Sequence, residues 1–361
     1  MKREFLLLAQ TYDEAKHRVN GWMLSTKMDG IRAFWDGGIT RGMPVKDVPF
    51  ANTLRDDRFI NQDIRSTGLW SRNAKVIRAP EWFLNKLPKI FLDGEIWAGI
   101  GKWEVASSIT GKIVPIDSDW KQLKYCVFDS PPARILFGDG IVDTEIYYKH
   151  FNNFLPWIND RAQQCMVTID PPNHEFEFIY SWLKNKGIEN DFVCILEQTQ
   201  LPYATDEIAL IINQRMDEAV AQGNEGLMVR KHESYWAPER SWNLLKIKKW
   251  YDDEAIVVGY TWGSRTTKGS KLLGKMGALL VAWKDKYFEI SGFNYAERDI
   301  VFKSTGANAS VVGYANPEQT VSDDLENRKF PRGSKITFRY RELTAKGIPS
   351  KAQYYRKPNS L

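Results

Sequence analysis

The stretch Lys27-Met28-Asp29-Gly30-Ile31-Arg32 decides how the rest of this chain is understood. It predicts a lysine on a short turn, with Asp-Gly behind it and an apolar strand after it. Taken alone, this lysine is most simply a surface residue. Three later stretches change that interpretation, and they are Leu92-Asp93-Gly94-Glu95, Glu225-Gly226-Leu227-Met228-Val229-Arg230 and Leu245-Lys246-Ile247-Lys248. One nucleophile, two acids and two further lysines in this order indicate a site that handles phosphate.

A lysine amine acts as a nucleophile only when it is unprotonated. Nearby cations or desolvation lower the pKa of a lysine and so favour its reactive form. Arg32, Lys246 and Lys248 are expected to supply such a positive field, and the same cations would hold the phosphates of a nucleotide. The Asp29-Gly30 turn is expected to let Lys27 project into a pocket.

Four other side chains complete the expected site. Glu95 and Glu225 stand on predicted strands beside glycines, and carboxylates suit Mg²⁺, which binds protein through one or two acids. The Phe128 ring could stack on a purine base, and Arg72 could hold a phosphate or a ribose. The structural alternatives are paired strand-end acids, a core phenylalanine and a surface arginine.

Composition and charge bound the class of protein. The chain has 361 residues, enough for two or three domains, and no apolar run approaches the ~20 residues needed to span a bilayer. Its three cysteines show no spacing typical of zinc sites or disulfide frameworks. Residues 251–361 hold 18 Lys and Arg against 12 Asp and Glu, so the positive charge is concentrated there. This excess favours contact with a polyanion such as nucleic acid, or a solvated basic surface.

The order of expected elements divides the chain in two. Strands are expected at 5–9, 22–25, 31–35, 69–72, 90–97, 123–129, 226–230 and 243–248, with Ile39-Thr40-Arg41 pairing back as a hairpin. Helices are expected at 11–21, 145–165, 174–187 and 205–222, and short ones near 83–87. From residue 251, short strands at 254–260, 277–283, 286–290 and 335–341 suggest a small barrel, of which the OB-fold is common in nucleic-acid binding. Residues 42–68 and 303–332 look like insertions.

One stretch imitates a phosphate-binding loop. The segment from Gly269 to Lys275 matches most of a Walker A motif, but Met276 follows where Ser or Thr should ligate magnesium. No strand–loop–helix context is expected there, so we reject that interpretation. Its lysines, with Arg265 and Lys268, remain candidates for contact with a nucleic-acid backbone.

The motifs together resemble those of the covalent nucleotidyltransferases, and among them the ATP-dependent DNA ligases of the minimal two-domain type. The 27–32 stretch looks like motif I, Ser71-Arg72-Asn73 like motif Ia, 92–95 like motif III and Phe128 like the motif IIIa aromatic. The stretches 225–230 and 245–248 are similar to motifs IV and V. The ending Tyr340-Arg341-Glu342-Leu343-Thr344 resembles that of minimal ligases, and the resemblance covers most of the chain.

The resemblance implies a reaction in three phosphoryl-transfer steps. Lys27 attacks the α-phosphate of ATP, pyrophosphate leaves, and a lysine–AMP phosphoramidate forms. AMP passes to the 5′-phosphate at a nick in duplex DNA, and the neighbouring 3′-hydroxyl displaces it and seals the backbone. The implied cofactors are ATP, which is consumed, and Mg²⁺. The implied context is DNA replication, repair or recombination, carried out by a monomer in the cytoplasm of a bacterium or a virus-infected cell.

The resemblance also assigns residues and domains. Arg32 and Arg72 would contact ribose or DNA phosphates, Phe128 adenine, and Lys246 and Lys248 the α-phosphate. Glu95 would contact ribose or metal, and Glu225 metal. Residues 1–249 would form an α+β adenylation domain of antiparallel sheets flanked by helices, and residues 250–361 an OB-fold barrel.

Two departures from the family pattern are visible. Thr26, which we place in the nucleotide site, stands where many ligases have an acid. The basic cluster that ends the family pattern has its nearest counterpart in Arg356-Lys357.

Two rival interpretations remain open. The chain also fits an RNA ligase or a capping guanylyltransferase of the same superfamily. A single-strand-binding OB module fused to an inactive domain is the alternative from another class.

Overall fold

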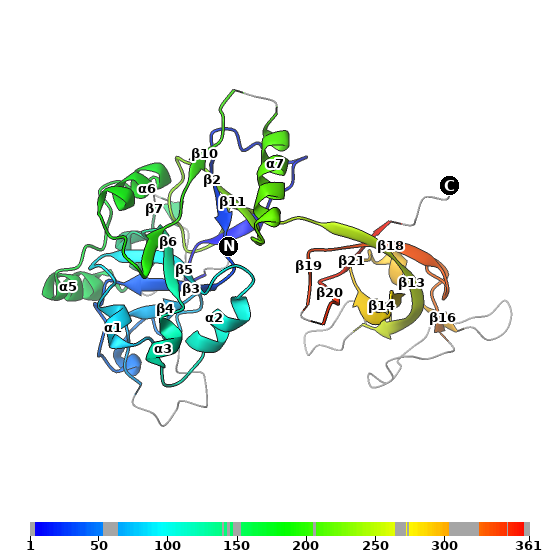
Figure 1. The fold of residues 1–361 in the computed structure, drawn as a ribbon, viewed down its shortest axis with the longest axis horizontal. Coiled ribbons are helices and arrows are strands. Elements are labelled where there is room, and N and C mark those ends of the chain that lie inside the picture. The colour runs from blue at the N-terminus through cyan, green and yellow to red at the C-terminus, as the bar shows by residue number, and fades with distance from the viewer. Residues whose placement is uncertain are drawn as a thin grey trace. The chain divides into compact units, whose positions relative to one another are not determined.

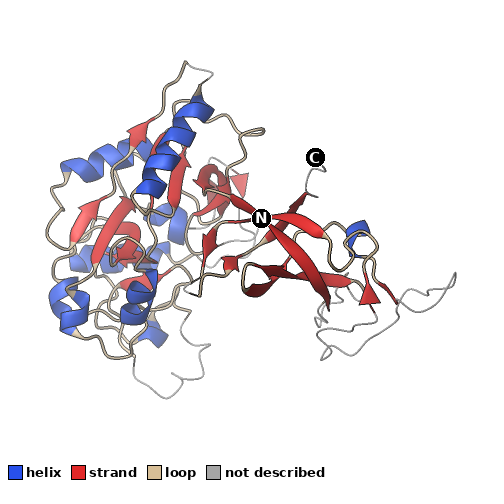
Figure 2. Cartoon of the chain, turned by 45° about the vertical axis from the view of Figure 1, so that its right-hand side comes forward, coloured by secondary structure: helices blue, strands red, loops and turns tan. Residues whose placement is uncertain are grey.

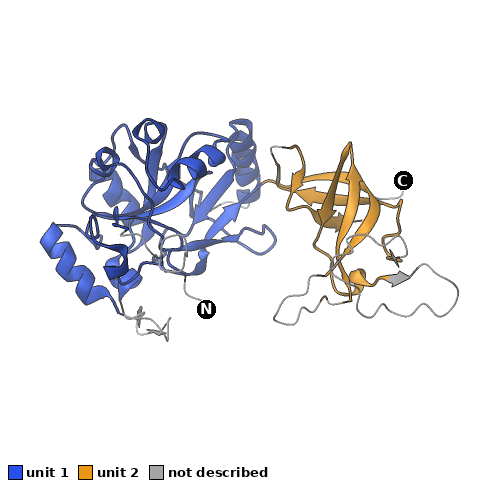
Figure 3. Ribbon diagram, turned by 90° about the horizontal axis from the view of Figure 1, so that it is seen from below, with its two compact units in different colours: residues 1–248 blue, residues 249–361 orange. Residues whose placement is uncertain are grey.

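The computed structural model describes residues 4–52, 64–138, 141–142, 145–146, 153–204, 207–263, 272, 274–302, 325–344 and 346–356. The chain divides into two compact units, Met1–Lys248 and Lys249–Leu361, which Figure 3 shows in different colours. The fold is mixed α and β, and every α-helix among the described residues belongs to the first unit (Figures 1 and 2). No helix among the described residues has both the length and the apolar character needed to cross a bilayer.

Among the described residues, the first unit contains two five-stranded sheets, a two-stranded sheet and seven α-helices. Its strands are β1 (Leu8–Thr11), β2 (Met23–Lys27), β3 (Ile31–Asp36), β4 (Leu69–Ser71), β5 (Phe91–Trp97), β6 (Lys124–Asp129), β7 (Ile141–Val142), β8 (Glu145–Ile146), β9 (Val193–Ile195), β10 (Thr199–Gln200), β11 (Gly226–Arg230) and β12 (Arg240–Ile247). Its helices are α1 (Glu81–Leu84), α2 (Trp103–Thr110), α3 (Asp117–Trp120), α4 (Ala133–Phe137), α5 (Leu155–Cys165), α6 (Phe176–Asn185) and α7 (Ile208–Ala221), with a 3-10 turn at Val45–Asp47.

The two sheets differ in how distant parts of the chain meet. One has the strand order β1-β12-β11-β2-β10 and the other β4-β3-β5-β6-β9. Antiparallel sheets were expected, and most strand pairs of the two sheets are antiparallel, but β1–β12 and β6–β9 are parallel pairs. The chain runs from β6 through α4, α5 and α6 before it reaches β9, and a helical crossover of this kind permits parallel pairing.

Strand alternation gives each sheet one packed face and one face toward the functional site. Residues i and i+2 of a strand lie on the same face. In β11 and β12, Leu227, Val229, Leu245 and Ile247 join α7 in an apolar cluster. In β5 and β6, Leu92, Ile96, Tyr125 and Val127 join a second cluster that includes α2 and α6. The intervening residues of these strands lie on the opposite face, toward the space between the two sheets.

Two glycines allow backbones to approach closely beside this space. A Cβ on Gly30 would lie 2.4 Å from the carbonyl oxygen of Ile96, so the turn after Lys27 packs directly on β5. Gly226 has φ +152°, and a Cβ there would lie 2.2 Å from the carbonyl oxygen of Ile247. No larger residue fits either position without a shift of the backbone.

The second unit is built on one five-stranded antiparallel sheet of order β15-β14-β13-β18-β21. Its elements are β13 (Tyr251–Trp262), β14 (Met276–Trp283), β15 (Lys286–Ile290), β16 (Val301–Phe302), β17 (Leu325–Glu326), β18 (Lys335–Tyr340), β19 (Glu342–Leu343), β20 (Pro349–Ser350), β21 (Gln353–Arg356) and a 3-10 turn at Ala296–Arg298. A single parallel bridge joins Ser291, just after β15, to Gln353 of β21. Val257, Leu279, Phe330 and Phe338 are among its fully buried core residues.

Several sequence expectations are confirmed and three are wrong. Helix α7 buries Ile208, Ile212, Met216 and Ala219 as expected, and the four strands expected after residue 251 are present as parts of β13, β14, β15 and β18. The helix expected at 145–165 begins only at Leu155, and residues 145–146 belong to β8. Residues 53–63 and 303–324 of the expected insertions lie outside the described part of the chain.

The expected helix at 11–21 is a series of turns. Thr11 ends β1 and pairs with Lys246, and Tyr12 N–H donates to the Lys246 carbonyl. Asp13 then closes a local turn with Ala15 and His17. Sheet pairing therefore takes the backbone groups that would have started the helix.

The expected return strand at 39–41 is also absent, because strand β3 pairs with β4 and β5 instead. The buried Asp36 carboxylate accepts hydrogen bonds from Gly38 N–H, the Thr40 hydroxyl and Trp70 Nε1. These bonds hold residues 37–42 in a turn, which prevents the hairpin.

Candidate active site

A pocket of about 330 Å³ lies between the two sheets of the first unit. Every residue that the sequence assigned to the nucleotide lines it, and these are Thr26, Lys27, Arg32, Arg72, Glu95, Phe128, Lys246 and Lys248. They come from β2, β3, β5, β6, β12, the turn after β4 and the residue that follows β12, and they are up to 222 positions apart (26 to 248). The fold therefore brings the scattered motifs to one place.

Lys27 ends β2 and meets a carboxylate at the edge of the pocket. Its Nζ contacts Glu225 Oε2, while Lys248 Nζ contacts Glu225 Oε1. Glu225, which immediately precedes β11, thus bridges the two lysines, and all three side chains are at most 23% exposed. An ion pair of this kind favours the protonated amine. The observed arrangement therefore differs from the expected field of cations alone, because a carboxylate lies against the Lys27 amine.

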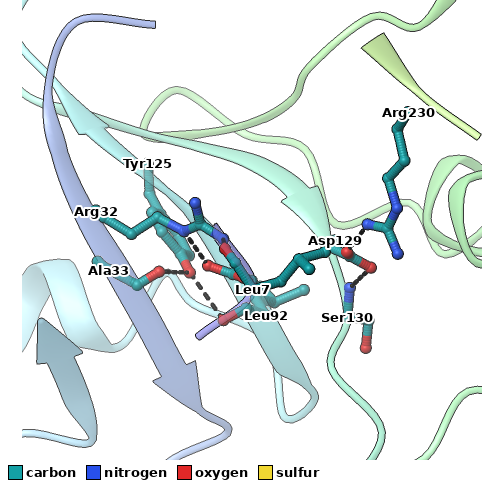
Figure 4. A network of polar contacts seen from close by, with 9 residues as sticks. Leu7, Arg32, Ala33, Leu92, Tyr125, Asp129, Ser130 and Arg230 are labelled. Atoms are coloured by element: carbon teal, nitrogen blue, oxygen red, sulfur yellow. Dashed lines mark hydrogen bonds and ion pairs between the residues drawn. The ribbon is translucent and has the colours of Figure 1, made fainter. Parts of the chain in front are cut away.

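Arg32 is fixed by a second carboxylate. Its Nε and Nη2 donate to Asp93 Oδ1 and Oδ2 at 2.5 and 2.6 Å, and Nη2 also donates to the Leu7 carbonyl at 3.3 Å. The Asp93 side chain is fully buried, whereas that of Arg32 is 19% exposed. Figure 4 shows Arg32 beside Leu7 in this network. Asp93 belongs to the 92–95 motif, for which the sequence indicated no role of this residue. In the structure it orients Arg32.

One face of the Phe128 ring is already covered. The Arg32 guanidinium carbon lies 4.5 Å from the ring centroid, within cation–π distance. A base that stacks on Phe128 must therefore use the opposite face of the ring. The two residues were predicted as separate contacts, and the structure couples them.

Glu95 lies on β5 directly opposite Arg32 of β3. Burial raises the pKa of its carboxyl to about 7, although Arg32 and Lys27 oppose this shift. The Glu95 carboxyl is therefore partly ionised near neutral pH. A cation that enters the pocket would complete its ionisation.

A buried ion pair that the sequence did not reveal forms another part of the pocket. Arg230 Nη1 contacts Asp129 Oδ2 (Figure 4). The Arg230 guanidinium also lies 4.0 Å from the Phe176 ring centroid. Asp129 and Arg230 are 2% and 6% exposed, and both line the pocket together with Phe176. Arg230 is the last residue of the 225–230 motif, and this position is the signal in the sequence that could have identified it. Nothing in the local pattern pointed to Phe176.

Arg72 and Lys246 are placed differently from the paired residues. Arg72 follows β4, is exposed, and has no hydrogen bond or ion pair to any described residue. Lys246 lies on β12 and faces the pocket beside Leu244. An exposed guanidinium that lines a pocket together with Lys246 and Lys248 is able to donate hydrogen bonds to an anion.

The residues fit a magnesium ion only together with a bound polyphosphate. No three His, Cys, Asp or Glu side chains within the described ranges cluster closely enough to hold a metal unaided. Magnesium usually keeps several waters and uses one or two carboxylates plus substrate phosphates. Glu95 lines the pocket, and Glu225 contacts the Lys27 amine that also lines it, so these two acids are the candidates for such a site.

Some predicted residues lie outside the structure described here. Arg265, Lys268, Lys271 and Lys357 are not among the described residues, and for Arg356 only the backbone, in β21, is described. Their predicted contacts with nucleic acid or pyrophosphate stay predictions.

Comparison with known proteins gives a consistent picture. No family model matches the chain. A DNA ligase of Haemophilus influenzae is 23% identical over 353 residues, which cover 97% of this chain and 91% of that protein. A solved structure of a Lig E DNA ligase, from a study of DNA binding with a minimal scaffold, aligns with a TM-score of 0.60 at 22% identity. The alignment covers 97% of this chain and 98% of the Lig E ligase chain.

The resemblance to DNA ligases is confirmed. It extends over nearly the whole chain in both comparisons, and the mixed α and β fold is shared with the Lig E structure. Several residues that carry the motifs line the pocket, and these are Lys27, Arg32, Arg72, Glu95, Phe128, Lys246 and Lys248.

Proposed function

We propose that this protein is an ATP-dependent DNA ligase that seals nicks between a 5′-phosphate and a 3′-hydroxyl in duplex DNA, with Lys27 as its nucleophile. The observation that carries the proposal is the convergence of Lys27, Glu95 and Lys248 at one pocket, with Glu225 paired to both lysines. The similarity to DNA ligases along the chain supports it independently.

In the first step, the Lys27 amine attacks the α-phosphate of ATP. The P–N bond forms, the bond to pyrophosphate breaks, and a lysine–AMP phosphoramidate results. Lys27 must first lose its proton and its contact with Glu225. Incoming phosphates would draw Lys248 and Lys246 toward themselves, which loosens the bridge through Glu225 and frees the amine.

The pocket offers a place for each part of the nucleotide. The free face of Phe128 would receive adenine, and Arg32, held by Asp93, would contact the ribose. Thr26 lines the pocket from the strand that carries Lys27. Lys246 and Lys248 would hold the α-phosphate.

Glu95 and Glu225 are the residues that would hold Mg²⁺. A bound magnesium ion neutralises negative charge on the phosphates during transfer. Glu95 contributes most when it is ionised, which its pKa of about 7 allows on cation binding. Glu225 becomes available once Lys27 and Lys248 release it.

The later steps require DNA. AMP would pass from Lys27 to the 5′-phosphate at the nick, and the 3′-hydroxyl would then displace AMP and form the phosphodiester bond. Arg72 at the mouth of the pocket would contact the 5′-phosphate. We assign residues 1–249 as the adenylation domain and residues 250–361 as an OB-fold domain that binds the duplex. The order of its five strands, with a parallel bridge between Ser291 and Gln353, supports a barrel of this kind.

A direct assay separates this function from its rivals. The purified chain is incubated with radiolabelled ATP or GTP and Mg²⁺, then offered nicked DNA or nicked RNA. We expect labelling by ATP and sealing of DNA, both lost in Lys27→Ala. Lys16→Ala, at an exposed lysine paired only with Asp13, is the matched control and should keep full activity. Labelling by GTP alone would identify a guanylyltransferase, and sealing of RNA alone an RNA ligase.

A further inference from the structure

Two of the three cysteines face each other across neighbouring strands. Cys126 of β6 and Cys194 of β9 are partners in the parallel register. Their Sγ atoms are 3.2 Å apart, and both thiols are free. Neighbouring strands lie about 4.8 Å apart, within the roughly 4.4–6.8 Å Cα separation of natural disulfides. A disulfide can therefore form here once the two sulfur atoms approach by about 1 Å.

The pair lies on the side of the sheet that faces the pocket. Tyr125, Val127, Val193 and Ile195, which alternate with the cysteines, belong to the buried cluster on the opposite face. Phe128 of β6 and Leu196, the residue directly after β9, each follow a cysteine by two residues, and both line the pocket. A change in the distance between β6 and β9 would thus be transmitted to the pocket wall.

We propose that Cys126 and Cys194 form a reversible disulfide when the protein meets a hydroperoxide, and that this bond slows the capture of nucleotide by Lys27. The second half rests on the proposed ligase function, whereas the first half does not.

The two thiols are suited to different roles. Cys126 is 2% exposed, whereas Cys194 is partly exposed and can be reached from solvent. The hydrogen bond with Cys126 lowers the pKa of the Cys194 thiol, which favours its thiolate. Cys194 is therefore the residue that meets the peroxide, and Cys126 is the residue that resolves the product.

The chemistry balances with hydrogen peroxide as the oxidant. The Cys194 thiolate attacks one peroxide oxygen, the O–O bond breaks, hydroxide leaves, and a sulfenic acid forms. The Cys126 sulfur then attacks Cys194 Sγ, the S–O bond breaks, and water leaves with the thiol proton. Two thiols and one peroxide give one disulfide and two waters, and dithiothreitol reverses the oxidation.

The expected effect follows from the change in distance. A disulfide bond is about 2.05 Å long, so the two sulfurs must approach from 3.2 Å. Misplacing a binding group by about 1 Å can slow a reaction by as much as about 100-fold. Because Phe128 is two residues from the new bond, we expect about tenfold slower adenylylation.

The test has two independent readouts. The full chain is treated with hydrogen peroxide, blocked with an alkylating agent, digested without reduction and mapped by mass spectrometry. Adenylylation by labelled ATP is timed on the same samples before and after dithiothreitol. We expect a linked peptide pair containing Cys126 and Cys194, and a slower rate that dithiothreitol restores.

Matched variants decide between outcomes. Cys165→Ser should respond to peroxide as the wild type does, and the variant with both Cys126→Ser and Cys194→Ser should keep its rate after peroxide. If substitution of the buried Cys126 impairs folding, the single variant Cys194→Ala replaces the double variant.

Absence of the linked peptide pair in folded wild type would overturn the proposal that the disulfide forms. An unchanged rate in linked protein would overturn the proposal that the disulfide slows the capture of nucleotide. If reduced protein takes no AMP at all, the ligase proposal fails while the peptide map still judges the disulfide.

Discussion

Replacing Arg32 by methionine should destabilise the first unit strongly. The substitution leaves the fully buried Asp93 carboxylate without the two hydrogen bonds of 2.5 and 2.6 Å that it now accepts. Removing one partner of a buried ion pair typically costs about 3–5 kcal/mol. For a unit of 248 residues, unfolding entropy near the midpoint is about 0.5 kcal/mol/K, so about 4 kcal/mol corresponds to a fall of about 8 °C in Tm.

The measurement is urea unfolding of the full chain, followed by far-UV circular dichroism, with a double-mutant cycle. The variant with both Arg32→Met and Asp93→Asn should recover much of the lost free energy of unfolding, because the uncompensated charge is gone. Arg41→Met is the matched control, since its partner Glu81 is 77% exposed, and it should cost under about 1 kcal/mol. Equal losses in Arg32→Met and Arg41→Met, or strict additivity in the cycle, would refute the reasoning.

Three further predictions concern the pocket. Phe128→Ala should raise the KM for ATP in adenylylation about tenfold, whereas Phe128→Tyr should change it little, because the ring supplies a stacking face. Arg72→Ala should leave adenylylation unchanged but slow nick sealing and reduce its salt dependence, as expected for loss of a phosphate contact. Glu95 has a folded-state pKa of about 7, above that of an unfolded glutamate, so its contribution favours folding at low pH and is lost as pH rises through 7. The free energy of unfolding of Glu95→Gln, relative to that of the wild type, should therefore rise between pH 5 and pH 8 by up to about 3 kcal/mol, as measured by urea unfolding. A constant difference across this range would contradict the raised pKa of Glu95.

The sequence contained enough information to place the pocket residues together. Lys27 and Glu225 sit at strand ends beside tight turns, where Gly30 and Gly226 are required by close backbone contacts. Residues on such turns escape the core and can converge, so local patterns were sufficient for Lys27 and Glu225. The identity of a lysine's partner is a different matter, because it depends on the arrangement of three strands.

Features that depend on long-range packing were missed for that reason. Whether Lys27 faces cations or the Glu225 carboxylate follows from the register of β2 with β11, which no local pattern encodes. The contact of Arg230 with Asp129 joins residues 101 positions apart. The helix expected at 11–21 failed because Thr11 pairs with β12, so tertiary pairing overrode a capping signal.

The central claim is that the amine of Lys27 becomes covalently joined to AMP. The most direct measurement is intact and peptide mass spectrometry of the chain after incubation with ATP and Mg²⁺ and no DNA. The account predicts one added AMP, located on the peptide that contains Lys27, lost in Lys27→Ala and released on addition of nicked DNA. AMP attached to any other residue, or wild-type nick sealing by Lys27→Ala, would contradict it.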